Sequence, residues 1–182
     1  MRPHLEYANQ VWAPMYKRQE TIIENVQRRA TKLVPGLKDL SFEDRLRSLG
    51  LPTLKYRRLR GDMIEMFKIL RSQYDARVAN FIKLHNSDNV TRGHQYKLRK
   101  EYIRTSKRKN SFVCRSLNMW NGLQSSVVNA PTVQAFETRL DKHWLLEPFK
   151  YCIDEDHPST YRKYYLEPTG EDFNSLQSDN VM

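Results

Sequence analysis

The residues of this chain best suited to chemistry are cations gathered in one short segment. Seven lysines and arginines fall within the thirteen positions from 97 to 109, and Glu101 is the one acid among them. Cations at this density neutralise phosphates and release counterions, so the segment predicts contact with a nucleic-acid backbone. A solvated basic loop is the alternative. The seven cations are Lys97, Arg99, Lys100, Arg104, Lys107, Arg108 and Lys109.

Aromatic side chains flank or interrupt this basic segment at Tyr96, Tyr102 and Phe112. Aromatic rings can stack on unpaired bases. Buried packing is the commoner use of such rings, and we expect all three to contribute to the core. We expect the same of Trp12, Trp120 and Trp144, each of which stands beside other apolar residues.

Patterns typical of enzymes and metal sites are missing. The sequence has no glycine-rich phosphate loop, no G-x-S-x-G turn and no H-E-x-x-H helix. Cys114 and Cys152 do not pair with histidines at the tight spacings of a structural zinc site. We therefore expect no catalytic residue, cofactor or metal, and two free thiols.

Length and charge narrow the class of protein. The chain has 182 residues and a formal net charge of +10. Residues 1–72 carry a net +7, residues 73–150 a net +8 and residues 151–182 a net −5. A body this basic favours a polyanionic partner, RNA or DNA before anionic lipid. No apolar run approaches the length of a membrane span, so we expect an intracellular protein of the nucleus or of a cytoplasmic ribonucleoprotein.

Hydrophobic periodicity predicts a mainly α fold in the first part of the chain. Helices are expected over 4–12, 17–34, 41–50 and 52–71. In the second of these, Ile22, Val26 and Ala30 share one face. Ser41 and Asp44 have the spacing of a capping box, and Gly50 is a stop signal.

The second part of the chain shows a weaker pattern. We expect an irregular connection over 73–95, a short strand over 96–104, a charged loop over 105–110 and a turn at Asn121-Gly122. Residues 111–117 fit either a strand or the start of a helix. A last helix is expected from Thr132 to Trp144, before Pro148. The resulting division is a helical region over 1–72, a basic mixed region over 73–150 and an acidic, disordered tail over 151–182.

Several ordered motifs resemble one family, the non-LTR (LINE-type) retrotransposon reverse transcriptases of the jockey kind. The resemblance covers roughly residues 2–146, and its longest motifs are Arg2-Pro3-His4-Leu5-Glu6-Tyr7-Ala8, Val26-Gln27-Arg28-Arg29-Ala30-Thr31-Lys32, Tyr56-Arg57-Arg58-Leu59-Arg60-Gly61-Asp62-Met63, Trp120-Asn121-Gly122-Leu123 and Phe136-Glu137-Thr138-Arg139-Leu140-Asp141-Lys142-His143-Trp144.

This resemblance implies the helical thumb and the region beyond it, which follow the catalytic palm in that family. The palm's aromatic-Ala-Asp-Asp motif is absent, and the sequence contains no Asp-Asp pair at all. A non-catalytic segment that grips RNA or an RNA–DNA duplex by its backbone is the function implied. The matching cations are Arg28, Arg29 and Lys32 on one helix, and Arg57, Arg58 and Arg60 on another.

Three alternatives accompany this hypothesis. The chain could complete a polymerase whose palm and fingers another chain supplies, or it could be an inactive relic of a transposon. It could also serve as a protein-interaction module. In that case the apolar face with Ile22, Val26 and Ala30, which a palm would cover, is expected to be exposed.

Overall fold

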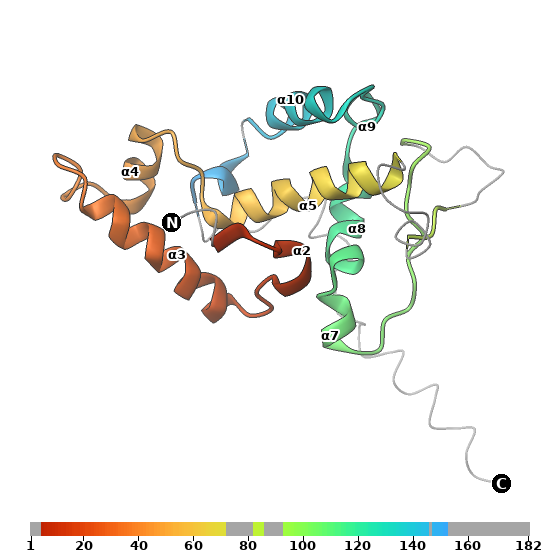
Figure 1. Cartoon of the computed structure of the whole chain (residues 1–182), viewed down its shortest axis with the longest axis horizontal. Helices are drawn as coiled ribbons and strands as arrows, with labels where there is room; N and C mark the ends of the chain where they lie inside the picture. The colour runs from red at the N-terminus through yellow and green to blue at the C-terminus, as the bar shows by residue number, and fades with distance from the viewer. Residues whose placement is uncertain (1–4, 72–81, 86–92, 146, 153–182) are drawn as a thin grey trace, which may run out of the picture.

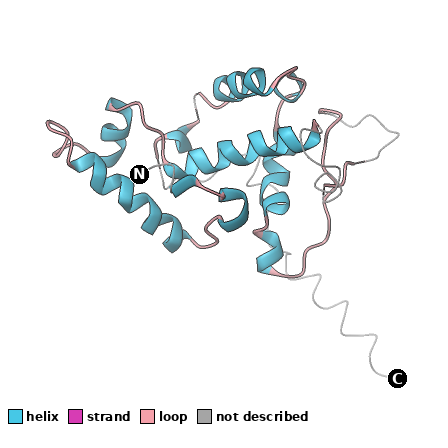
Figure 2. Cartoon of the chain, viewed as in Figure 1, coloured by secondary structure: helices cyan, strands magenta, loops and turns pink. Residues whose placement is uncertain are grey.

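The computed structural model describes residues 5–71, 82–85, 93–145 and 147–152. Within these residues the protein consists of helices joined by loops (Figure 2). One isolated antiparallel β-bridge links Leu84 with Leu98. The predicted mainly α fold class is confirmed. The strand expected over 96–104 is wrong, because this segment contributes only the bridge at Leu98. The expected acidic tail lies outside the described residues, apart from positions 151 and 152.

Four helices with defined bounds lie within residues 5–71 of the described structure. They are α2 (Asn9–Trp12), α3 (Lys17–Lys32), α4 (Phe42–Ser48) and α5 (Leu54–Leu70). The helix expected over 4–12 is interrupted at Ala8, whose φ of 51° is left-handed, so α2 starts only at Asn9. The caps of α4 follow the prediction. The Ser41 hydroxyl accepts a hydrogen bond from the Asp44 backbone N–H at 3.1 Å, and Gly50 takes a φ of 62° just beyond the helix.

The second part is more helical than its sequence pattern suggests. It forms α7 (Ser106–Lys109), α8 (Phe112–Gly122), α9 (Ser125–Val128), α10 (Val133–His143) and the 3₁₀ turn η1 (Pro148–Lys150). The charged loop expected over 105–110 contains α7, and the helical alternative for 111–117 is right. Asn121 and Gly122 end α8 instead of forming a separate turn, and α9 was not expected. The last helix begins as expected, with the Thr132 side chain capping Ala135.

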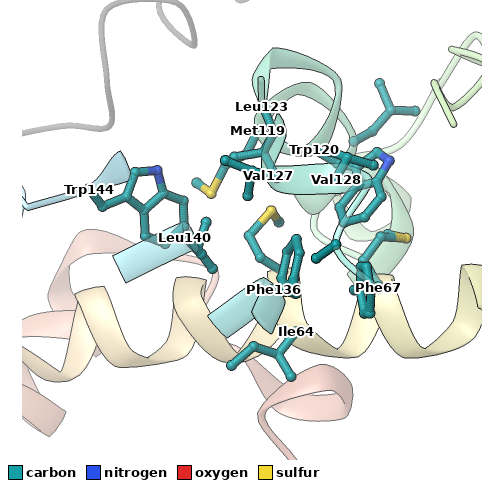
Figure 3. Close-up of a cluster of buried hydrophobic side chains, with 14 of the residues drawn as sticks. Ile64, Phe67, Met119, Trp120, Leu123, Val127, Val128, Phe136, Leu140 and Trp144 are labelled. Atoms are coloured by element: carbon teal, nitrogen blue, oxygen red, sulfur yellow. The ribbon is translucent and has the colours of Figure 1, made fainter. Parts of the chain in front are cut away.

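The core forms around α5, which contacts α2, α3, α8 and α10 (Figure 1). Phe67 on α5 stacks on Phe136 of α10, with ring centroids 4.4 Å apart (Figure 3). Trp120 and Trp144 are buried as expected, whereas Trp12 is 39% exposed, so its expected core role is wrong. The boundary expected at residue 72 separates α5 from α8 and α10 in sequence, although all three contribute to this one core.

Helix α3 packs on α4 and α5 through polar side chains. Glu24 is buried, and its two carboxylate oxygens accept from the Leu54 backbone N–H at 3.0 and 3.2 Å. The Gln27 side chain donates to the Pro52 carbonyl at 3.1 Å, and the Thr31 hydroxyl accepts from Arg45 at 3.2 Å. The apolar side chains Ile22, Val26 and Leu33 lie on the opposite side of the helix and are exposed.

Candidate nucleic-acid interface

The basic segment from Lys97 to Lys109 lies on the surface beside α8. It runs from the β-bridge at Leu98 to the end of α7, and the Thr105 hydroxyl caps α7 by accepting from the Arg108 backbone N–H at 3.4 Å. Six of its seven cations are exposed: Arg99, Lys100, Arg104, Lys107, Arg108 and Lys109. Lys97 is half-buried, and its side chain runs across Gly93.

Side chains of α8 fix the start of this segment. The Asn121 amide accepts from the Leu98 N–H at 2.8 Å and donates to the Leu98 carbonyl at 2.9 Å. The indole N–H of Trp120 donates to the Tyr96 carbonyl at 2.8 Å, and the His94 ring lies 3.0 Å from the Trp120 carbonyl oxygen. Burial lowers the pKa of His94, although the hydrogen bond to the Trp120 carbonyl opposes this change. These contacts hold the basic segment in a defined position next to the core.

Glu101 organises the middle of the segment. Its carboxylate lies 2.9 Å from the Lys83 ammonium and 3.3 Å from the Arg108 guanidinium. The Lys83 ammonium, helped by Arg108, holds the pKa of the Glu101 carboxyl below its usual value. Lys83, which the sequence pattern did not single out, thus joins the basic surface.

Three exposed cations of the segment contact no carboxylate among the described residues: Arg99, Arg104 and Lys107. They are the side chains most available to an added anion. Tyr102, which lies between them in sequence, is 88% exposed, so its expected place in the core is wrong. Tyr96 and Phe112 do pack against the core as expected.

The arginines predicted on α5 are used inside the protein. Arg58 is buried, and burial lowers its pKa. Arg57 forms a two-pronged ion pair with Glu6, and Arg60 pairs with Asp141 at 2.6 Å. All three are predicted to bind nucleic acid, and the structure shows each of them packed or paired with a carboxylate of this chain.

Arg57 and Arg60 also line a groove of about 610 Å³ at the start of α5. Tyr56, Lys142, Lys150 and Tyr151 complete most of its lining. The carboxylates of Glu6 and Asp141 lie in the same lining and offset its positive charge. The groove is therefore a weaker anion site than the basic segment.

The cations predicted on α3 are exposed. Arg29 and Lys32 extend from the surface of the helix, and the Arg28 guanidinium lies over the Phe42 ring at 4.9 Å. They lie on α3, whereas the basic segment ends in α7. The structure thus separates the predicted cations into two largely exposed groups, on α3 and in the basic segment, and one partly buried group on α5.

A buried ion pair connects the interface to the core, and sequence reasoning missed it. Asp62 on α5 accepts from Arg115 of α8 at 2.8 and 2.9 Å, and from the Asn9 side chain at 2.9 Å. Burial raises the pKa of Asp62, and the Arg115 guanidinium opposes this rise. No spacing rule links positions 62 and 115, so the signal is visible only in the folded protein.

The described part of the chain offers no cluster of three metal-binding side chains, and Cys114 and Cys152 are free and half-buried. None of its helices combines the length and apolar content that crossing a bilayer requires. Comparison with known proteins gives no relative: no protein-family model, curated protein or solved structure matches this chain.

Proposed function

We propose that this protein binds RNA or an RNA–DNA duplex through the phosphate backbone, using the basic segment 97–109. The observation that carries the proposal is the exposure of Arg99, Arg104 and Lys107 without carboxylate partners in the described structure. The hydrogen bonds from Trp120 and Asn121 hold the start of this segment in place. The segment therefore loses little conformational entropy when it binds the duplex. Contacts to phosphate are independent of base sequence.

We also propose that this protein derives from the region after the palm of a LINE-type reverse transcriptase. It binds nucleic acid but catalyses no reaction itself. The ordered motifs within residues 2–146 and the mainly helical fold support this assignment. Residues of those motifs hold the interface together. Trp120 and Asn121 anchor the basic segment, and Arg115 crosses to Asp62.

The test is binding of the full chain to a labelled RNA–DNA duplex, followed by fluorescence anisotropy across a salt series. The variant Arg99→Gln/Arg104→Gln/Lys107→Gln removes the three available cations. Each lost phosphate contact lowers the slope of log affinity against log salt by about 1, so a drop of about 3 is expected.

A matched control removes the same charge elsewhere. Lys17→Gln/Lys38→Gln/Arg139→Gln changes three exposed cations that lie outside both the segment and the groove. Its slope should stay within about 1 of the wild type, since long-range attraction alone is screened over about 10 Å at 0.1 M salt. Equal losses in the two variants would show that total charge, and not this segment, binds the duplex. No binding by the wild type at low salt would refute the proposal.

A further inference from the structure

Helix α3 presents an uncovered apolar face. Ile22 is 58% exposed, Val26 36% and Leu33 84%. At 100° per residue these three side chains fall within about 40° of one another around the helix axis. Ala30 is exposed on the same side, and the opposite side carries the buried Glu24, Gln27 and Thr31. A contiguous exposed apolar stripe of this kind marks an interaction surface.

A row of cations borders one edge of this stripe. Arg18, Arg29 and Lys32 follow the stripe on the same side of the helix, again at helical spacing, and all three are exposed. None of them contacts a carboxylate within the part of the chain that the structure describes. The occupant that fits such a face combines apolar side chains with acidic ones.

A second copy of α3 does not meet this requirement. Antiparallel pairing along the stripe sets the two basic edges against each other, and these like charges oppose association. Parallel pairing sets each basic edge against the uncharged edge of the other helix and supplies no acidic partner. An acidic, partly apolar segment matches the face better.

The chain contains such a segment after residue 152. Residues 151–182 hold seven acidic and two basic side chains. Between 166 and 179, the apolar Leu166, Phe173 and Leu176 alternate with carboxylates. Those carboxylates are Glu167, Glu171, Asp172 and Asp179.

The segment can reach α3. The described chain ends near α4, where Arg47 lies over the Tyr151 ring at 5.5 Å, and α4 packs on α3. The connecting residues 153–165 can span about 40 Å when extended. Helix α3 is only about 24 Å long.

We propose that the apolar face of α3 is the docking site for the acidic segment 166–179 of the same chain. Its apolar side chains cover Ile22, Val26 and Leu33, and its carboxylates face Arg18, Arg29 and Lys32. This contact would also screen the α3 cations from other anions, leaving the basic segment 97–109 as the open surface. The proposal does not depend on nucleic-acid binding.

The test is zero-length coupling of lysines to carboxylates in the full chain without nucleic acid, followed by peptide mass spectrometry. Links from Lys32 to Glu167, Glu171 or Asp172 are expected. The variant Ile22→Ser/Leu33→Ser, which changes only exposed side chains, should reduce their yield at least fivefold. Phe173→Ser/Leu176→Ser should do the same from the other side of the contact.

The control Val11→Ser/Leu145→Ser changes two exposed apolar residues elsewhere and should leave the yield unchanged. An equal mixture of isotopically light and heavy chains separates the possible occupants. Links within one isotope only support docking inside the chain, whereas mixed light–heavy links would show that another copy covers α3. Mixed links, no links, or links that survive both serine variants would each overturn the proposal.

Discussion

The side-chain amide of Asn121 forms two hydrogen bonds with the backbone of Leu98, accepting from its N–H and donating to its carbonyl. A neighbouring strand offers an extended residue the same pair of bonds. Backbone bonds on the adjoining residues link Lys97 to His85 and Arg99 to Lys83, both at 2.8 Å. Leu98 is thus held on both sides, which fixes where the basic segment leaves the core.

Replacing this amide should release the segment. Asn121→Ala leaves a buried N–H and C=O without partners, and we expect the free energy of unfolding to fall by about 1–3 kcal/mol. Amide hydrogen exchange at Leu98 should accelerate more than exchange in α5. Urea unfolding and exchange measured by mass spectrometry provide the two readouts. Asn118→Ala on the same helix is the control, and an equal loss in both variants would argue against the anchoring role.

The buried pair of Asp62 and Arg115 should be costly to break from one side. Their side chains are 3% and 15% exposed. Asp62→Ala leaves the guanidinium without its carboxylate, and a loss of about 3–5 kcal/mol in unfolding free energy is expected. Denaturant unfolding monitored by tryptophan fluorescence measures this loss.

The double variant Asp62→Leu/Arg115→Met separates the charge from the packing. Apolar residues of similar volume remove both charges together, so most of the stability lost in Asp62→Ala should return. If the double variant is less stable than Asp62→Ala, then the pair stabilises the fold by more than neutralising two buried charges. Asn9, which contacts both partners, would then be the side chain to change next.

The sequence predicts the helices well where one periodic pattern spans many residues. The predictions for α3 and α5 differ from the structure by two residues or fewer at each end, and Ser41, Gly50 and Thr132 mark helix ends as expected. Periodicity does not say which face of a helix is covered. On α3 the side with Glu24 and Gln27 is buried, because those side chains satisfy backbone groups at the start of α5.

At the candidate site, too, the sequence predicts features that lie within one segment but not contacts between residues far apart in sequence. Charge density alone located the segment 97–109, since counting cations needs no partner. It does not reveal that Arg57 and Arg60 form ion pairs within the chain, because their partners Glu6 and Asp141 lie 51 and 81 positions away in sequence. The strand expected over 96–104 was wrong for a related reason: the backbone pairing is limited to the bridge with Leu84, and the Leu98 N–H and carbonyl are bonded by the Asn121 side chain.

Glu24 makes stability depend on pH. Burial raises the pKa of this carboxyl above its ordinary value, although bonds from the Leu54 N–H oppose the rise. Between the ordinary and the raised pKa, the folded protein holds more protons than the unfolded chain, so stability falls as pH rises. Glu24→Gln keeps an oxygen that can accept from Leu54 but does not titrate.

The unfolding free energy of the wild type, relative to Glu24→Gln, should therefore be highest below pH 4.5 and decline as pH rises through the folded-state pKa. Urea titrations at pH 4, 5, 6 and 7 test this trend. Glu147→Gln, at a half-exposed position, is the control and should show no such decline. A relative stability that increases with pH would mean that the hydrogen bonds outweigh burial and lower the pKa of Glu24.

The ion pair with Glu6 determines whether Arg57 of α5 is available to bind phosphate. Both prongs of Arg57 are used by Glu6, one of them at 2.7 Å. The charge-neutral double variant Arg57→Gln/Glu6→Gln removes the pair without altering net charge. If Arg57 serves only Glu6, duplex affinity and its salt slope should match the wild type. The unfolding free energy should fall by about 1 kcal/mol or less, as is usual for partly exposed pairs. A slope reduced by about 1 would instead show that Arg57 exchanges Glu6 for a phosphate, which would make the groove beside α5 part of the nucleic-acid interface.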